Sequence, residues 1–190
     1  MSRARLILVT TNEHKLAELR PIFAEYGVAL ESKDIEKVEI RHDSVETVAE
    51  QAARHAFEFI QQPVIVDDTG LYIDALAGFP RSYPAFVLET IGRKGILKLL
   101  EGVADRSARF VTAVGYADGK HLQTFVGEMC GAVSLEERGS EGFGYDPIFI
   151  PEGFARTYAE LTFKEKTAIS HRTRAFRSFL NWYHKESNKP

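Results

Sequence analysis

The sequence predicts an α/β fold with a mixed sheet. Two short apolar runs at residues 6–9 and 64–66 have the character of buried strands, and helical patterns lie between them. Two longer strand segments, at residues 109–116 and 121–130, are separated by an Asp-Gly turn signal typical of a hairpin. We expect the hairpin region to form a second lobe, with a cleft between the two lobes.

The N-terminal segment predicts a strand, a loop and a helix. Leu6–Val9 is the strand, and apolar residues recur at helical spacing as far as Tyr26. Asn12 stands at the N-cap position, and Gly27 stands where a left-handed residue ends a helix. Pro21 lies inside this pattern and lacks a backbone N–H, so we expect a kink or a break there.

Residues 44–60 give the clearest helical pattern, with one stripe of valine, alanine and phenylalanine. Asp43 and Glu46 have the spacing of a capping box. The next strand runs directly into Asp67-Asp68, and glycine and proline in residues 71–83 predict turns.

The C-terminal half predicts shorter elements. A helix at residues 91–100 is interrupted by glycines, and residues 146–150 resemble a strand. Thr162 and Glu165 form a capping-box pair for a short helix, and Ser170 can cap a last helix.

Composition excludes several classes of protein. The 190 residues carry 24 basic and 27 acidic side chains, a net charge of −3, so no basic footprint indicates a nucleic-acid partner. The lone cysteine, Cys130, cannot form an internal disulfide, which fits a reducing compartment. No apolar run reaches the roughly 18 residues of a membrane span. We expect a cytoplasmic protein.

Four segments could carry chemistry, and the first follows the first strand. Thr10–Lys15 joins small hydroxyl residues to a helix start, where free N–H groups can cradle phosphate. The alternative is an ordinary Asn-capped helix with a solvated lysine.

The second and third segments are an acidic pair and a glycine-rich turn. Asp67-Asp68 suits a divalent cation and a water, although acids before Thr-Gly also form turns. Residues 141–147, EGFGYDP, alternate glycines with aromatics, which lets a backbone approach a flat base. A glycine-rich turn carrying core aromatics is the alternative.

The fourth segment, residues 164–177, is rich in lysine and arginine. A solvated helix face is the usual explanation of such a run. His171 and Arg172 stand at a helix start, however, where they could meet a phosphate or a polar base edge.

Together, the motifs T-x-N-x-x-K, DDTGL, GFGYDPIF and EKTAISHR make residues 6 to about 183 similar to the inosine triphosphate pyrophosphatases. This Ham1-like family acts on noncanonical purine nucleoside triphosphates. The stretch TIGRKGILKLLEG resembles the family's archaeal branch. The resemblance implies Mg²⁺-dependent hydrolysis of ITP, dITP or XTP to the monophosphate and pyrophosphate. It also implies an elongated, two-lobed α/β domain over residues 1–190, with a long mixed central sheet flanked by helices, and a homodimer.

The resemblance also implies site residues. Asp68 matches the catalytic carboxylate, and Glu39 and Asp68 match the metal ligands. The positions that match substrate-binding residues are Thr10, Thr11, Asn12, Glu13, His14, Lys15, Thr69, Phe143, Gly144, Tyr145, Asp146, Lys166, His171 and Arg172.

Some positions depart from the family's pattern. Thr11 stands where many members have glycine or serine, Arg81 replaces a common glycine and Pro84 replaces a serine. Either Asp68 or Asp67 could orient or deprotonate the attacking water.

Two rival functions remain at this point. One is a pyrophosphatase of standard or pyrimidine triphosphates, and the other is a nucleotide-binding protein without catalysis.

Overall fold

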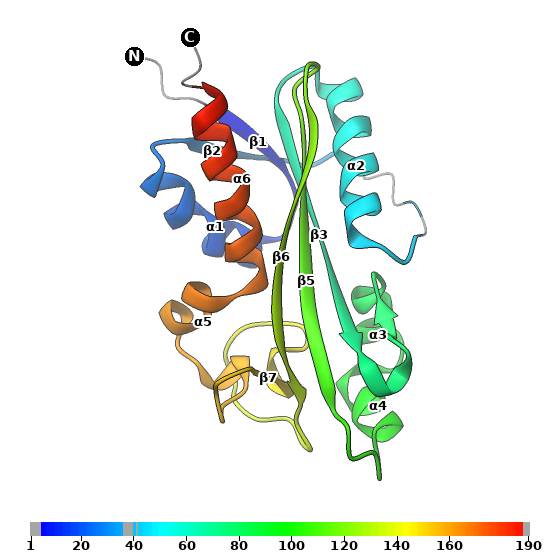
Figure 1. Ribbon diagram of the computed structural model, residues 1–190. Coiled ribbons are helices and arrows are strands. Elements are labelled where there is room, and N and C mark those ends of the chain that lie inside the picture. Colours follow the sequence, from blue (N-terminus) through cyan, green and yellow to red (C-terminus); the bar gives the residue numbers. More distant parts are fainter. Residues whose placement is uncertain (1–4, 36–39, 41, 188–190) are drawn as a thin grey trace. The chain divides into compact units, whose positions relative to one another are not determined.

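A seven-stranded sheet with helices on its faces forms the protein (Figure 1). The computed structural model describes residues 5–35, 40 and 42–187. The strand order is β2-β1-β3-β5-β6-β7, and β4 pairs with β3. Strand β1 is parallel to β2 and β3, whereas β4 and β7 are antiparallel to β3 and β6. The predicted α/β class and mixed sheet are therefore confirmed.

The strands are β1 (Arg5–Val9), β2 (Ala29–Lys33), β3 (Val64–Ile73), β4 (Pro80–Arg81), β5 (Ser107–Ala117), β6 (Leu122–Val133) and β7 (Phe149–Pro151). The α-helices are α1 (Glu13–Glu25), α2 (Val45–Ile60), α3 (Pro84–Thr90), α4 (Gly92–Leu99), α5 (Phe163–Ile169) and α6 (His171–Ser187). Short 3₁₀ turns cover Asp74–Leu76, Asp146–Ile148 and Tyr158–Glu160. Among the helices of the described residues, none combines the length and apolarity that crossing a membrane requires.

The chain divides into two compact units, and the first holds β1, β2, α1, α2 and most of α6. Alternate residues of β1 enter different cores, because successive side chains of a strand point to opposite faces. Leu6 and Leu8 pack with α1 and α6, whereas Ile7 and Val9 pack with α2. Figure 1 shows α1 and α6 on one face of these strands and α2 on the other.

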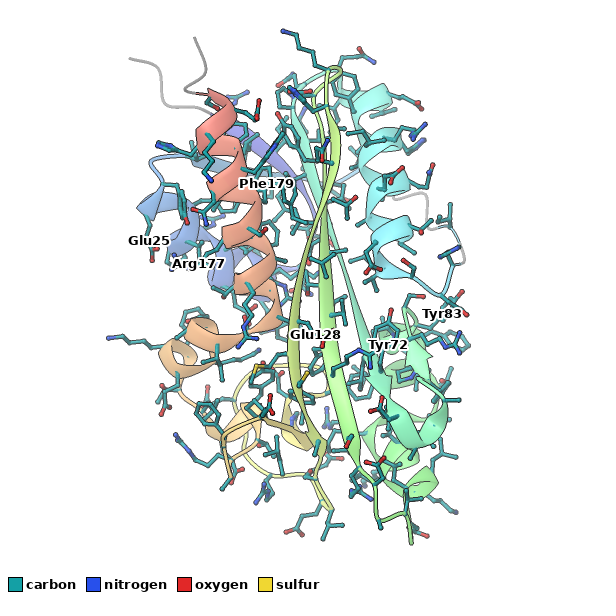
Figure 2. All side chains as sticks on the ribbon, viewed as in Figure 1. Glu25, Tyr72, Tyr83, Glu128, Arg177 and Phe179 are labelled. Atoms are coloured by element: carbon teal, nitrogen blue, oxygen red, sulfur yellow. The ribbon has the colours of Figure 1, made fainter. Side chains whose placement is uncertain are left out.

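Helices α1 and α6 pack closely within this unit. Phe23 meets Phe176 edge to face at 5.8 Å. At the surface, the Arg177 guanidinium lies 2.7 Å from the Glu25 carboxylate, and Figure 2 shows the two side chains together. These contacts fix the direction of α6, whose first residues include Arg172.

The second unit comprises residues 69–111 and 128–171. Its core gathers Leu71 and Ile73 of β3, Phe110 of β5, and Phe149 and Tyr158. Helices α3 and α4 contribute Val87 and Ile96 to the same core. The turn at residues 142–146 belongs to this unit and stands against that core through the buried Tyr145.

Several local expectations are wrong in detail. Of the kink or break expected at Pro21, the break is absent: helix α1 continues through this residue, since Ala17, whose carbonyl loses its partner, is exposed and can be solvated. Helix α2 is capped by Ser44 rather than by the expected Asp43. Strand β3 continues past Asp67-Asp68 to Ile73, so the acids lie inside a strand, not at its end. The capping box of Thr162 and Glu165 is confirmed.

Three elements have no counterpart among the expectations, and one was anticipated only in part. Strands β2 and β4 and helix α3 were not indicated by hydrophobic periodicity, because all three are short. The strand expected at residues 146–150 is instead a 3₁₀ turn followed by β7. The hairpin of β5 and β6 is confirmed.

Candidate functional site

The loop between β1 and α1 is ordered by its own side chains. Asn12 caps α1, and its Oδ1 accepts a hydrogen bond from the Lys15 N–H at 3.1 Å. The Thr10 hydroxyl accepts one from the Asn12 N–H at 3.1 Å. Thr11, Glu13 and His14 are exposed. The loop thus presents the start of a helix and several polar side chains to solvent, an arrangement that favours anions.

Three buried charged groups and the partly exposed Lys15 meet next to this loop. The Lys15 ammonium lies 2.8 Å from Asp67 Oδ2, and the Arg172 Nε lies 3.5 Å from the same oxygen. The Arg172 Nη1 donates to Glu18 at 2.6 Å. We call Lys15, Asp67, Arg172 and Glu18 the charge network. Two cations and two carboxylates make it neutral, which is the condition under which buried charges are tolerated.

The two adjacent acids of β3 face opposite sides of the sheet. Asp67 is fully buried and points towards α1 and α6, because its partners come from those helices. Strand alternation directs Asp68 to the other face, the one that α2 covers and that receives Val64 and Val66. Asp68 is half-buried. Asp67, which is held by two cations, and Asp68 next to it therefore lie in different environments on opposite faces of the sheet.

A Mg²⁺ ion fits this donor set only in part. Within the described residues, no cluster of three acidic, histidine or cysteine side chains could hold a metal. Mg²⁺, however, is commonly bound by one or two carboxylates together with substrate phosphates. Asp68 supplies one such carboxylate, and Glu39, the other expected ligand, lies outside the described residues. Thr69 follows Asp68 on β3 and is half-buried.

The glycine-rich turn of the second unit is closed around Asp146. Its Oδ2 accepts from the Phe143 N–H at 2.7 Å and from the Lys166 ammonium at 2.7 Å. The Lys166 ammonium also lies 4.7 Å above the centre of the Phe143 ring. A Cβ at Gly142 would stand 2.1 Å from Asp146 Oδ2, so this position requires glycine. The turn is a preformed structure that combines an aromatic face with a buried lysine.

Helices α3 and α4 brace the turn. The Tyr145 hydroxyl donates to the Pro84 carbonyl at 2.9 Å. Burial raises the pKa of Tyr145 to about 12, with Arg93 opposing it, so the hydroxyl stays a proton donor at neutral pH. Arg93 of α4 donates to the Gly144 carbonyl at 3.0 Å. Pro84, which departs from the family's pattern, thus supplies a carbonyl that holds Tyr145.

The His171 ring stacks on Phe110 of the second unit, with centroids 4.7 Å apart and planes 21° apart. His171 is buried, so its ring is part of the packing around it. Arg172, the next residue, is engaged by Glu18 and Asp67 in the first unit. The sequence indicated neither of these partnerships, because they join residues far apart in the chain.

Sequence reasoning missed Glu18 and Arg93. Glu18 is a charged residue on the buried side of α1, next to Leu19, and this break in an apolar stripe was a usable signal. Arg93 lies on a short helix whose contact with Gly144 spans 51 positions of the chain, and no local pattern indicates it.

The fold and these side chains define an α/β protein whose described residues include buried ion pairs and one half-buried acid, Asp68, on the central sheet. A family model described as the Ham1 family matches residues 6–182. The chain belongs to the Ham1 family.

Archaeal relatives and solved structures agree with this assignment. The chain is 51% identical over 178 residues to a dITP/XTP pyrophosphatase of Pyrobaculum aerophilum, covering 94% of this chain and 95% of the relative. It is 49% identical over 180 residues to the dITP/XTP pyrophosphatase of Methanopyrus kandleri, covering 94% and 96%. The solved Staphylococcus aureus Ham1 protein is 26% identical, with a TM-score of 0.85 over 96% of this chain and 99% of that one.

Proposed function

We propose that this protein hydrolyses noncanonical purine nucleoside triphosphates, such as ITP, dITP and XTP, to the monophosphate and pyrophosphate. Membership of the Ham1 family supports the reaction class, and relatives covering nearly the whole chain are named dITP/XTP pyrophosphatases. The observation that carries the proposal is the separation of the two acids on β3. Asp67 is tied to two cations, and Asp68 beside it is half-buried on the opposite face.

The proposed reaction needs charge stabilisation more than covalent chemistry. A water oxygen bonds to the α-phosphorus, the bond to the bridging oxygen of the β-phosphate breaks, and pyrophosphate leaves with that oxygen. Asp68 takes the proton of the attacking water, because the Oδ2 of Asp67 is already engaged by Lys15 and Arg172. Bound Mg²⁺ supplies neutralisation of phosphate charge, and Asp68 and Glu39 are the residues proposed to hold it.

Lys15 is the cation proposed to meet the triphosphate. Its side chain is 15% exposed, unlike the fully buried Asp67 with which it pairs. An incoming phosphate competes with Asp67 for the ammonium, while Arg172 keeps Asp67 compensated. The network thus allows Lys15 to change partner without leaving an isolated buried charge.

Selection of the base rests on a difference at C6, where inosine and xanthosine carry an oxo group and adenosine an amino group. A protein donor fixed at that position hydrogen-bonds to the oxo oxygen, whereas an amino group there leaves the donor unpaired. The backbone N–H groups of the turn at residues 142–146 are the proposed donors, and Phe143 is the proposed stacking surface. Lys166 adds positive charge beside that ring.

The deciding experiment measures pyrophosphate release from ITP, dITP, XTP, ATP, GTP, CTP and UTP, with Mg²⁺ and with a chelator in its place. We expect fast turnover of ITP, dITP and XTP that requires Mg²⁺. Equal or faster turnover of UTP or ATP would favour the pyrophosphatase of standard triphosphates. Tight binding of ITP without release of pyrophosphate would favour a nucleotide-binding protein.

The homodimer and the cytoplasmic location stay predictions. Light scattering on the purified protein, with and without ITP, measures the oligomeric state directly. Fractionation of the source cells measures the location.

A further inference from the structure

Arg93 joins the glycine-rich turn to helix α4 through two separate hydrogen bonds. Its Nη1 donates to the Gly144 carbonyl at 3.0 Å, and its Nε donates to the Glu137 carboxylate at 2.8 Å. One third of the Arg93 side chain is exposed, so most of it is packed against the protein. A planar guanidinium that donates in two directions fixes both partners at once.

The Gly144 carbonyl, which accepts the bond from Arg93, belongs to a glycine of the turn with a positive φ. Gly144 has a φ of +62°, and no atom lies within 4 Å of where its Cβ would be, so the space beside it is open. On either side, Phe143 is fixed by Asp146 and Tyr145 is fixed through Pro84. Glycine rotates its peptides at low cost. The bond from Arg93 is the hydrogen bond that holds the Gly144 carbonyl of the Gly144–Tyr145 peptide.

This orientation decides where a donor points. In a trans peptide the C=O and the N–H point in opposite directions. With its carbonyl turned towards Arg93, the peptide directs the Tyr145 N–H away from α4. Within the described part of the chain, the Gly144 and Tyr145 N–H groups donate to no protein acceptor. A turn that holds a carbonyl in place by an arginine and leaves the opposite N–H open is arranged to bind an acceptor.

We propose that Arg93 is a positioning residue that holds the Gly144–Tyr145 peptide so that its N–H donates a hydrogen bond to the 6-oxo oxygen of a bound purine. This inference rests on the proposed function and adds to it the residue that tunes base selection. Arg93 itself need not touch the nucleotide. Its effect passes through the Gly144 carbonyl.

The test compares Arg93→Ala and Arg93→Lys with Lys94→Ala, a control that removes the same charge from the next position of α4. Lys94 is exposed. For each protein, kcat and KM are measured with ITP and with ATP, together with the melting temperature. In Arg93→Ala we expect the preference for ITP over ATP, as a ratio of kcat/KM, to fall about five- to tenfold, mainly through KM for ITP. Arg93→Lys retains one donor and should give an intermediate ratio, and Lys94→Ala should match the wild type.

The outcomes separate this inference from the function on which it rests. A wild-type protein without preference for ITP overturns the proposed function before any variant is compared. A wild type that prefers ITP, with an unchanged ratio in Arg93→Ala, overturns only the role of Arg93. A lower melting temperature with an unchanged ratio also overturns it, because a purely structural brace would change stability alone. If Arg93→Ala does not fold, the ratio in Arg93→Lys decides, and a wild-type value rejects the role.

Discussion

The Lys15 ammonium lies 2.8 Å from Asp67 Oδ2, so a helix start expected to meet phosphate is joined to a fully buried acid of β3. The same acid is 3.5 Å from Arg172 Nε. One buried carboxylate therefore links two cations that lie 157 positions apart in the chain (172 − 15). This link distinguishes Asp67 from its neighbour and gives the first prediction.

Asp68→Asn and Asp67→Asn should impair different properties of the protein, the first its activity and the second its stability. Asp68→Asn removes a half-buried proton acceptor, and we expect pyrophosphate release from ITP to fall at least about 100-fold with little change in melting temperature. Asp67→Asn removes the charge that compensates Lys15 and Arg172, and its free energy of unfolding should fall by about 3 kcal/mol or more. Kinetics and thermal unfolding on both variants check this. Near wild-type turnover in a folded Asp68→Asn variant would reject the role of Asp68.

Lys15→Ala should weaken triphosphate binding without changing base selection. We expect KM to rise about tenfold or more for ITP and for GTP alike, since a charge-assisted contact to phosphate is lost in both. Steady-state kinetics on the two substrates measure the effect, with Arg20→Ala as the comparison, since it removes an exposed cation from the same helix. A changed ratio of ITP to GTP at unchanged KM would contradict a phosphate role for Lys15.

Arg172→Ala tests whether the buried arginine reads the base or only supports the fold. If it reads the 6-oxo group, kcat/KM for ITP should fall more than for ATP, by a factor worth roughly 1–3 kcal/mol. Its contacts with Glu18 and Asp67 also predict a loss of stability of about 3–5 kcal/mol. Glu18→Gln is the matched variant, because it loosens Arg172 without removing it. Equal losses for ITP and ATP in both variants would assign Arg172 a structural or phosphate role.

Gly142→Ala and Gly144→Ala form a controlled pair within the turn. Both positions have positive φ, at +75° and +62°, so both substitutions strain the backbone. Only at Gly142 does the new methyl meet Asp146 Oδ2, at 2.1 Å. We expect Gly142→Ala to lower the melting temperature and raise KM for ITP clearly more than Gly144→Ala. Similar effects from the two variants would show that the contact of Asp146 with the turn matters little.

Asp118 should make folding stability depend on pH in the acid range. Burial opposes its ionisation, but hydrogen bonds from His121, Lys120 and Tyr116 outweigh burial and lower its pKa to about 2. Because the folded pKa lies below the ordinary value of about 3.9, the stabilisation is complete above pH ~4 and declines as the pH falls towards 2.

Asp118→Asn measures this contribution. At pH 7 the variant should be less stable than the wild type by about 1–2 kcal/mol, after allowance for screening by solvent. The difference should shrink between pH 4 and pH 2 in denaturant titrations. A gap that stays constant over that range would show that the carboxylate charge is not the source of the stabilisation.

Local signals in the sequence were sufficient for much of the fold. The apolar stripe of α2, the Asp-Gly turn between β5 and β6, and the capping box at Thr162 each depend on residues within one or two turns of the chain. The same holds for the Asn12 cap and for the left-handed Gly27, which has a φ of +69°. Short elements such as β2 and α3 were not predicted, because five to seven residues carry too little periodicity to indicate their structure.

The candidate site depended on both the sequence and the tertiary structure. The sequence by itself determined which side chains are available to the site: a lysine after a capped loop, two adjacent acids, a glycine-rich aromatic turn and a basic helix start. It also determined the resemblance to a family. The tertiary structure decided which of these side chains lie in contact. Strand alternation in β3 separates Asp67 from Asp68, and the packing of α1 and α6 brings Glu18 to Arg172 at 2.6 Å. Buried charges need partners, and those partners come from distant segments, so only the folded chain specifies that Asp67 is the acid that meets Lys15 and Arg172.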